Sequence, residues 1–246
     1  MISKNQIKFI RQLEQKKYRK KEQLFVAEGP KVVGDLLHAG FTPHSIFATE
    51  AWAHQGRSFQ EVSDEELQRI SFLQHPQQVL AVFRLPSDAI CQSSPTPDTS
   101  SLALALDDVQ DPGNLGTIIR IADWFGITNI YCSENTADAW NPKVVQATMG
   151  SIARVSIVYT DLAELIGKAK VPVYGTLLDG ENIYAQELSA NGIIVMGNEG
   201  NGISPKIRQL ITRKLLIPQF HEGPESLNVA IATAITCSEF RRRTRS

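Results

Sequence analysis

Hydrophobic and polar positions along the first third of the chain alternate between strand-like and helix-like spacing. The predicted elements are a short apolar run at Leu24–Ala27, a helix over Pro30–His38 and strands over Ser45–Ala48 and Gln78–Leu85. Gly40 marks the end of the helix. The pattern Ser63-Asp-Glu-Glu66 is a capping box that opens another short helix. This part of the chain is therefore expected to be a small α/β unit.

The rest of the chain alternates more strongly. Strands are predicted at Leu102–Val109, Asn129–Cys132, Val155–Tyr159, Val171–Leu177, Ile193–Met196 and Lys214–Ile217. Helices are predicted at Leu115–Phe125, Pro142–Met149, Leu162–Ala169, Pro205–Ile211 and Leu227–Arg242. Asn141 and Ser204 each precede a proline and are expected to be N-caps. Near-continuous apolar strands that alternate with helices favour a mostly parallel sheet covered on both faces.

A segment rich in Ser, Thr and Pro separates the two parts. Cys91–Ser101 has no apolar periodicity and is typical of a linker. We therefore expect an N-terminal domain over residues 1–92, a linker over 93–101 and a C-terminal domain over 102–246. The three cysteines form no CxxC pair, which disfavours a disulfide framework or a zinc site.

Composition and charge narrow the class of protein. Among the 246 residues, 42% are hydrophobic and 21% are charged, which is ordinary for a globular protein. No apolar run approaches the ~20 residues that cross a bilayer, and no signal peptide is visible, so we expect a soluble, cytoplasmic protein. The net charge is −1, yet residues 1–21 carry eight basic side chains against Glu14, and the chain ends in an arginine-rich run. These ends fit contact with a phosphate backbone or, equally well, solvated termini.

Three polar loops follow predicted strands, where ligands bind in parallel sheets. In the first, LDDVQDPGNLGTIIR, Asn114 occupies a candidate N-cap position. Helical spacing then places Gly116, Arg120 and Asp123 opposite the apolar face. Arg120 either meets a ligand on that side, with Gly116 permitting a close approach, or pairs with Asp123 as an ordinary surface residue.

The second and third loops are less specific when each is taken alone. In IVMGNEGNGIS the glycines 197, 200 and 202 precede a helix, but the spacing fits neither a dinucleotide fingerprint nor a Walker loop. Glu199 suits a hydroxyl or a cation better than a pyrophosphate, and a tight turn with a solvated Glu is the alternative. In LIPQFHEGPESLNVA, Ser226 is the expected N-cap and Asn228 lies in the first turn, which is also compatible with ordinary capping. His221 has no partner at metal-ligand spacing.

Together the three loops resemble the three motifs of the SpoU (TrmH-like) RNA ribose methyltransferases of the SPOUT superfamily. The matching segments are DPGNLGTIIR, MGNEGNGIS and IPQF with ESLNVAIA, and NPKVVQATMGSI resembles the segment between the first two motifs. The resemblance covers about residues 102–240. The region from Phe25 onward resembles the small RNA-binding domain, similar in shape to ribosomal proteins, that precedes the catalytic domain in many members. The third loop departs from the family by being longer and more acidic.

The resemblance implies a deep trefoil knot that binds S-adenosylmethionine, a homodimer with its active site at the subunit interface, and methylation of a ribose 2′-hydroxyl in RNA. No metal and no membrane are implied. Ribosomal RNA of the large subunit is favoured and transfer RNA is the alternative. The implied catalytic residues are Asn114, Arg120, Glu199, Ser226 and Asn228. The implied cofactor-binding residues are Thr176, Leu177, Met196, Gly197, Gly202, Ile217, Leu227 and Asn228.

Two other classes of function compete with this interpretation. A non-catalytic RNA-binding or ribosome-assembly factor on the same fold predicts loss of Arg120, Glu199 or Asn228, and all three are present. A nicotinamide-dependent enzyme needs a dinucleotide fingerprint that is absent.

Because a guanidinium is a poor base at neutral pH, we expect Arg120 to bind the target phosphate and stabilise the developing oxyanion, with water or a partner-subunit residue taking the proton.

Overall fold

The computed structural model describes residues 1–52, 58–86, 99–221 and 226–243. It divides into two compact units. The first combines Met1–Ser87 with Asp138–Ala153, and the second combines Asp88–Ala137 with Arg154–Ser246. Residues 93–98 of the expected linker lie outside the described residues. Among the helices described, none is both long enough and apolar enough to cross a bilayer.

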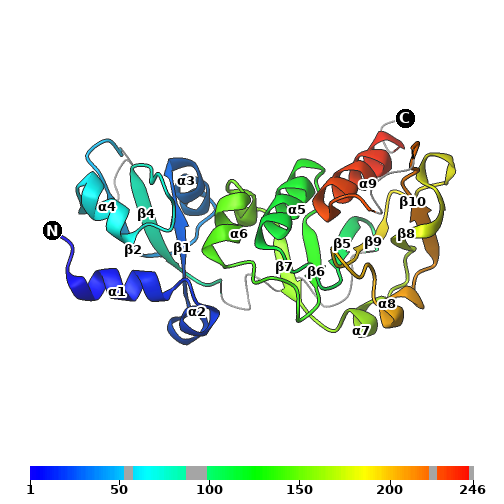
Figure 1. Cartoon of the computed structure of the whole chain (residues 1–246), viewed down its shortest axis with the longest axis horizontal. Coiled ribbons are helices and arrows are strands. Elements are labelled where there is room, and N and C mark those ends of the chain that lie inside the picture. Colours follow the sequence, from blue (N-terminus) through cyan, green and yellow to red (C-terminus); the bar gives the residue numbers. More distant parts are fainter. Residues whose placement is uncertain (53–57, 87–98, 222–225, 244–246) are drawn as a thin grey trace. The chain divides into compact units, whose positions relative to one another are not determined.

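The first unit is built on a small mixed sheet. Its strands, in spatial order, are β1 (Leu24–Glu28), β4 (Val79–Arg84), β2 (Pro43–Ala48) and β3 (Gln60–Glu61). Its helices are α1 (Lys4–Gln12), α2 (Lys16–Glu22), α3 (Pro30–His38), α4 (Asp64–Ile70), α6 (Pro142–Ala147) and a 3₁₀ turn at Ser151–Ala153. The predicted helix over Pro30–His38 and the capping box at Ser63 are confirmed. Figure 1 shows these elements along the chain.

The basic N-terminus is folded. The side chains of Ile2, Ile10 and Leu13 are buried in the core of the first unit with residues of β1, β2, α4 and β4. Arg19 is 2% exposed and forms an ion pair with Asp138. It also donates hydrogen bonds to the carbonyl oxygens of residues 13 and 14. Arg19 therefore stabilises the fold, and the exposed basic side chains are carried by two packed helices.

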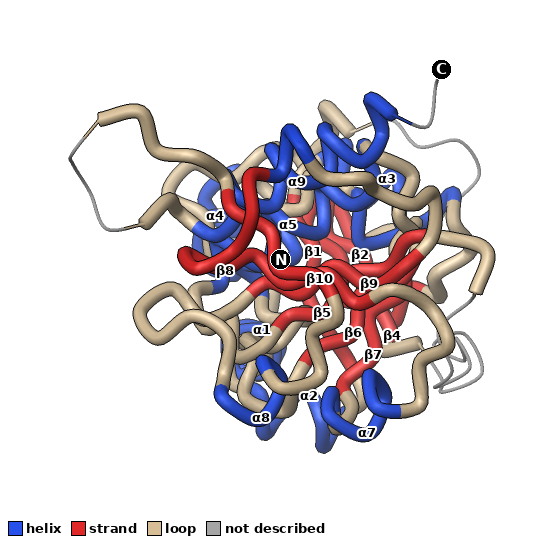
Figure 2. The backbone as a smooth tube through the Cα atoms, turned by 90° about the vertical axis from the view of Figure 1, so that its right-hand side faces the viewer, coloured by secondary structure: helices blue, strands red, loops and turns tan. Residues whose placement is uncertain are grey.

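The second unit confirms the predicted parallel sheet. The strands, in spatial order, are β10 (Arg213–Leu216), β8 (Val173–Asn182), β9 (Gly192–Met196), β5 (Leu102–Leu106), β6 (Asn129–Cys132) and β7 (Ser156–Tyr159), and every pairing is parallel. The helices are α5 (Pro112–Trp124), α7 (Leu162–Gly167), α8 (Pro205–Arg208), α9 (Val229–Arg243) and a 3₁₀ turn at Ile183–Ala185. Figure 2 shows α5 and α9 on one side of the sheet and α7 and α8 on the other.

Alternation along the strands explains this three-layer arrangement. Ala103 and Ala105 of β5 pack with Ile193 and Val195 of β9 in a core that also contains apolar residues of α7 and α8. Successive side chains of a strand point to opposite faces, so the intervening residues face the layer of α5 and α9. On that side the ring of Tyr174 contacts the ring of Phe240 in α9, with centroids 4.8 Å apart.

The arginine-rich C-terminus is also occupied within the fold. Arg241 Nε donates to the carbonyl oxygen of Phe125 at 2.7 Å, where α5 ends. Arg242 and Arg243 both pair with the buried carboxylate of Glu239, and Arg243 also reaches backbone carbonyls near Tyr184. Arg241 and Arg243 hold α9 against the domain and Arg242 pairs within the helix, so the first role of these side chains is structural. Arg245 lies outside the described residues.

Two predicted helix starts are wrong. Helix α5 begins at Pro112, with Asp111 as the N-cap whose carboxylate accepts from the backbone N–H of Asn114 at 2.8 Å. Asn114 is therefore in the first turn. Helix α9 begins at Val229, and the side chain of Asn228, not that of Ser226, accepts from the first free backbone N–H groups. Several residues at each start satisfy the capping preference, and only packing selects one of them.

Candidate functional site

The three loops singled out in the sequence follow β5, β9 and β10. Strands β5 and β9 are neighbours, and β8 lies between β9 and β10, so the carboxyl ends of these parallel strands share one edge of the sheet. A pocket of about 570 Å³ lies at this edge. Its size is within the range of ordinary small-molecule and cofactor sites.

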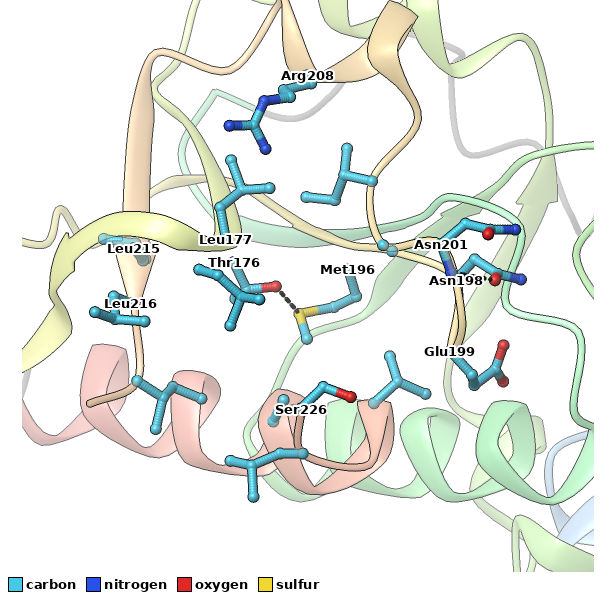
Figure 3. Close-up of a pocket in the computed structure, with 18 of the residues that line it drawn as sticks. Thr176, Leu177, Met196, Asn198, Glu199, Asn201, Arg208, Leu215, Leu216 and Ser226 are labelled. Atoms are coloured by element: carbon cyan, nitrogen blue, oxygen red, sulfur yellow. Dashed lines mark hydrogen bonds between the residues drawn. The ribbon is translucent and has the colours of Figure 1, made fainter. Parts of the chain in front are cut away.

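The pocket collects most of the residues expected to bind the cofactor. Those that line it are Thr176, Leu177, Met196, Gly197, Gly202, Ile217 and Leu227. Glu199 and Ser226, expected to be catalytic, line it as well. In Figure 3, Thr176 and Met196 lie in the middle of the pocket, with Arg208 and Ser226 toward opposite ends. Asn114, Arg120 and Asn228 do not line it.

Backbone makes part of the wall. A side-chain carbon added at Gly197 would clash with backbone atoms of Gly202 and Ile203, so only glycine lets the chain double back there. Asn198 stabilises this turn, because its Oδ1 accepts from the backbone N–H of Gly200 and of Asn201, each at 2.9 Å. The loop after β9 therefore presents main-chain atoms to the pocket.

A chain of polar side chains connects the three loops. Asn228 Nδ2 donates to Asn114 Oδ1 at 2.9 Å, and Asn114 Nδ2 donates to Glu199 Oε1 at 3.0 Å. The Oδ1 of Asn228 already accepts from the start of α9. Each amide therefore has its donor and acceptor ends fixed. The structure brings Asn114, Glu199 and Asn228 together although 85 or more residues separate Asn114 from each of the other two.

The Glu199 carboxylate anchors this chain. It also accepts from the backbone N–H of Gln110 at 3.3 Å and of Asp111 at 3.2 Å. Partial burial is the largest single effect and raises its pKa, but the hydrogen bonds from Asn114 and the backbone outweigh it and lower the pKa below its ordinary value. Glu199 is therefore ionised at neutral pH and ties the second loop to the first.

Arg120 stands apart from this cluster on the exposed side of α5. Asp123, its expected surface partner, is held by Arg154, whose Nη2 lies 2.7 Å from Asp123 Oδ2. Within the part of the chain that the structure describes, the Arg120 side chain has no hydrogen-bond or ion-pair partner. Gly116 is buried, so it is not part of the exposed face that carries Arg120.

Sequence reasoning missed part of the pocket. Asp179 and Arg208 line it and form an ion pair, which Lys214 joins from β10 with its Nζ 3.0 Å from the same carboxylate oxygen. Hydrogen bonds from Lys214 and Arg208 lower the pKa of Asp179 to about 2. These residues lie on separate elements, and no local signal links them. The role of Asn198 could have been predicted, because an Asn side chain in a glycine-rich turn commonly accepts hydrogen bonds from the backbone N–H groups that follow it.

The fold and the site define a class. An α/β domain places a glycine-walled, partly apolar pocket at the carboxyl edge of a parallel sheet. Oriented amides lie beside the pocket, and the adjoining helix carries Arg120, whose side chain has no partner among the described residues. This is the architecture of a cofactor-binding α/β domain. In the described residues, no set of three or more His, Cys, Asp or Glu side chains is placed to hold a metal.

Comparison with known proteins identifies the family. The model of the SpoU rRNA methylase family matches residues 101–238, more than half of the chain, so the protein belongs to that family. The model of the MRM3-like substrate binding domain matches residues 4–81. The resemblance deduced from the three loops is therefore confirmed.

Similar proteins span the whole chain. This chain is 32% identical over 250 residues to the 23S rRNA (guanosine(2553)-2′-O)-methyltransferase RlmP of Bacillus subtilis, and the match covers 97% of each protein. The structure of an rRNA methyltransferase from Sinorhizobium meliloti with AdoMet bound is 32% identical, with a TM-score of 0.87 over 100% of this chain and 98% of that one. A TrmH-family protein from Porphyromonas gingivalis is 42% identical, with a TM-score of 0.85 over 99% of both chains.

Proposed function

We propose that this protein methylates a ribose 2′-hydroxyl of large-subunit ribosomal RNA with S-adenosylmethionine as the methyl donor. The observation that carries the proposal is the amide chain from Asn228 through Asn114 to Glu199 beside the pocket at the carboxyl edge. Family membership supports the reaction. Similarity over almost the full chain to an enzyme named for 23S rRNA supports the RNA target.

The residues present fit the cofactor. Leu177, Met196, Ile217 and Leu227 offer apolar side chains for the adenine and the thioether region, and the backbone at Gly197 offers polar atoms for the edges of the base. When bound there, the cofactor supplies a methyl group on a sulfonium, an electrophile that needs no metal. The protein contributes the positions of the groups around it.

Positioning is the main task of the polar residues in this proposal. Methyl transfer is an in-line displacement, so a rate gain comes from holding the ribose oxygen against the methyl carbon. Asn114 presents an amide whose orientation is fixed from both ends. Its second N–H is available for the ribose or the adjoining phosphate.

Arg120 supplies positive charge. It lacks a partner among the described residues, and a guanidinium stays protonated at neutral pH. It binds the target phosphate and stabilises the developing oxyanion, while the 2′-hydroxyl proton leaves to water or to a residue of a second subunit. The products are the 2′-O-methyl ribose, S-adenosylhomocysteine and a proton.

A homodimer is part of the proposal. Trp124 is 83% exposed on α5, and Ile231 on the adjoining α9 is 52% exposed. Large exposed apolar side chains on the outer helices of a domain are typical of a protein interface. Arg120 is exposed on α5 one turn before Trp124, so a second copy on this face would share the active site. The enzyme would act in the cytoplasm, where we place its ribosomal RNA substrate.

A knotted backbone accompanies the cofactor site in this proposal. Segments after β9 and after β10 line the same pocket, and Asn228, just before α9, donates a hydrogen bond to Asn114 of α5. An experimental trace of residues 197–228 tests the knot.

The experiment that tests the function transfers labelled methyl groups from S-adenosylmethionine to RNA from a strain that lacks this gene. The RNA is fractionated by size, and alkali-resistant linkages mark 2′-O-methylation. Label in large-subunit RNA that disappears with Asn114→Ala is the expected result. Label in transfer RNA would overturn the target but keep the chemistry. Cofactor binding without transfer to naked RNA or to ribosome-assembly intermediates would favour a non-catalytic factor.

A further inference from the structure

The first unit contains a cavity of its own, with a volume of about 290 Å³. Its walls come from the end of β1, from the turn that follows α4, and from α6, which contacts β1 directly. Figure 1 shows α6 next to β1. Every residue that lines the cavity belongs to the first unit, so this cavity is separate from the cofactor pocket.

A buried carboxylate faces this cavity. Glu28 lines it and is 4% exposed. Its Oε1 accepts from the backbone N–H of Phe72 at 2.8 Å, and its Oε2 accepts from the hydroxyl of Ser71. A carboxylate has about four acceptor positions, so roughly two remain for other donors. Burial raises the pKa of Glu28 despite these hydrogen bonds and the nearby Arg11. Further N–H donors would relieve that desolvation.

The other walls carry an aromatic ring and two unused polar side chains. Phe72 is half-buried and lines the cavity, and the guanidinium of Arg11 lies 4.9 Å from its ring centroid. Lys143 and Gln146 of α6 line it too, and in the described chain neither side chain forms a hydrogen bond or an ion pair. An aromatic face with amide and carboxylate groups is how proteins hold an unpaired RNA base.

A row of basic side chains lies on α1 of the same unit. Lys4, Lys8 and Arg11 recur at helical spacing along one face of α1, and all three are exposed. Arg11 of this stripe contacts the ring of Phe72, which lines the cavity, and donates to the backbone carbonyl of Ser71. A row of basic side chains that ends at a base-sized cavity suits a nucleotide strand, since each charge can meet one phosphate.

We propose that this cavity, which we call the α6 pocket, holds one unpaired nucleotide of the RNA, with guanine preferred. The Watson–Crick edge of guanine presents two adjacent N–H groups, which match the open acceptor positions of Glu28. Gln146 contacts the same edge, and Lys143 and Arg11 bind the flanking phosphates. The inference rests on the proposed function in taking RNA as the substrate. It adds a recognition site and a base.

The test measures binding of fluorescein-labelled 11-mer RNAs to the full-length protein by anisotropy. The probes are oligouridine with a central G, A, C, U or inosine. We expect the G probe to bind about tenfold more tightly than the U probe. Inosine lacks the exocyclic amino group and should lose part of that advantage. Equal affinity for all five probes would overturn the proposal.

Two variants separate recognition from folding. In Glu28→Gln the amide oxygen can still accept from the Phe72 N–H and the amide N–H can donate to Ser71, so the melting temperature should change little. The amide cannot accept both guanine donors, so the preference for G should disappear. A variant that keeps the preference would refute the role of Glu28. Lys143→Met should lower the slope of log Kd against log salt by about one.

Lys170→Met is the matched control, because Lys170 is an exposed lysine of the second unit that makes the same change of charge. If it reduces the slope as much as Lys143→Met does, the effect is one of net charge and the α6 pocket is refuted as a phosphate contact. Methyl transfer to ribosomal RNA is measured on the same preparations. A protein that methylates RNA but shows no base preference defeats this inference alone. One that prefers G but methylates no RNA defeats the proposed function alone.

Discussion

The Glu199 carboxylate offers the sharpest test of whether the polar cluster positions substrate or takes a proton. Replacing it with Ala removes the acceptor for three hydrogen bonds, from Asn114 Nδ2 and from the backbone N–H groups of Gln110 and Asp111. The lost donors are exposed and can turn to water. We therefore expect the free energy of unfolding to fall by only about 1–2 kcal/mol, and Tm by a few degrees.

The effect on activity should be much larger than the effect on stability. Without Glu199 the amide of Asn114 is held only through its bond to Asn228 and can rotate away from the substrate. A misplacement of about 1 Å costs on the order of 100-fold in rate, so kcat of Glu199→Ala should fall by about that factor. The assay is transfer of tritiated methyl groups to 23S rRNA at saturating cofactor, with calorimetry of the same samples.

The control is Glu199→Gln. Its amide oxygen can take the place of Oε1 and still accept from both Asn114 and Asp111, which leaves only the exposed N–H of Gln110 facing a donor. This variant should keep most of the activity. If it is as inactive as Glu199→Ala while remaining folded, the negative charge itself is required, and the positioning argument is refuted in favour of a proton acceptor.

Four further predictions each concern a single residue. Arg120→Lys should lower kcat/KM for RNA at least tenfold, since lysine lacks the bidentate fork, and near-full activity in methyl transfer would contradict a bidentate contact. Gly197→Ala should abolish calorimetric binding of S-adenosylmethionine, because its methyl group would collide with the backbone of the same loop; unchanged binding would show that the loop can open. Trp124→Glu should convert a dimer to a monomer in sedimentation velocity, and an unchanged sedimentation coefficient would remove α5 from the interface. Hydrogen bonds from Arg242 hold the pKa of Glu239 at about 2 despite burial, so Glu239 stabilises the fold above its unfolded pKa and loses this effect as pH falls toward 2; the wild type should lose more stability than Glu239→Gln between pH 5 and pH 2.5 in chemical denaturation.

The α/β alternation and the parallel sheet were predictable from the sequence. Strands such as β6 and β9 are short apolar runs bounded by polar residues, and this local signal survives in the fold because both faces of a parallel sheet are buried. Helix α3 was predicted at the observed bounds because its apolar spacing, its N-terminal proline and Gly40 agree. The three loops were recognisable because their residue types are unusual over consecutive positions.

Helix starts and the roles of charged residues were not predictable in this way. Asp111 and Asn114 are both good N-caps, and Asn114 is released to its site role because Asp111 takes the cap. The basic run at the N-terminus was compatible with solvated residues, yet Ile10 and Leu13 anchor it in the core and Arg19 is buried. Charge is visible in a sequence, but burial depends on residues that are distant along the chain.

The sequence by itself determined the class of fold, the family and most of the residues around the pocket, since these depend on local periodicity and on short motifs. Only the tertiary structure decided how those residues work. It joined Asn228, Asn114 and Glu199 into one oriented chain of hydrogen bonds. It paired Asp123 with Arg154 instead of Arg120, and it formed a cavity in the first unit partly from residues of α6. Each of these features brings together residues that are far apart in the sequence. The physical reason is the same in each case: two groups interact when they are close in space, whatever the number of residues between them.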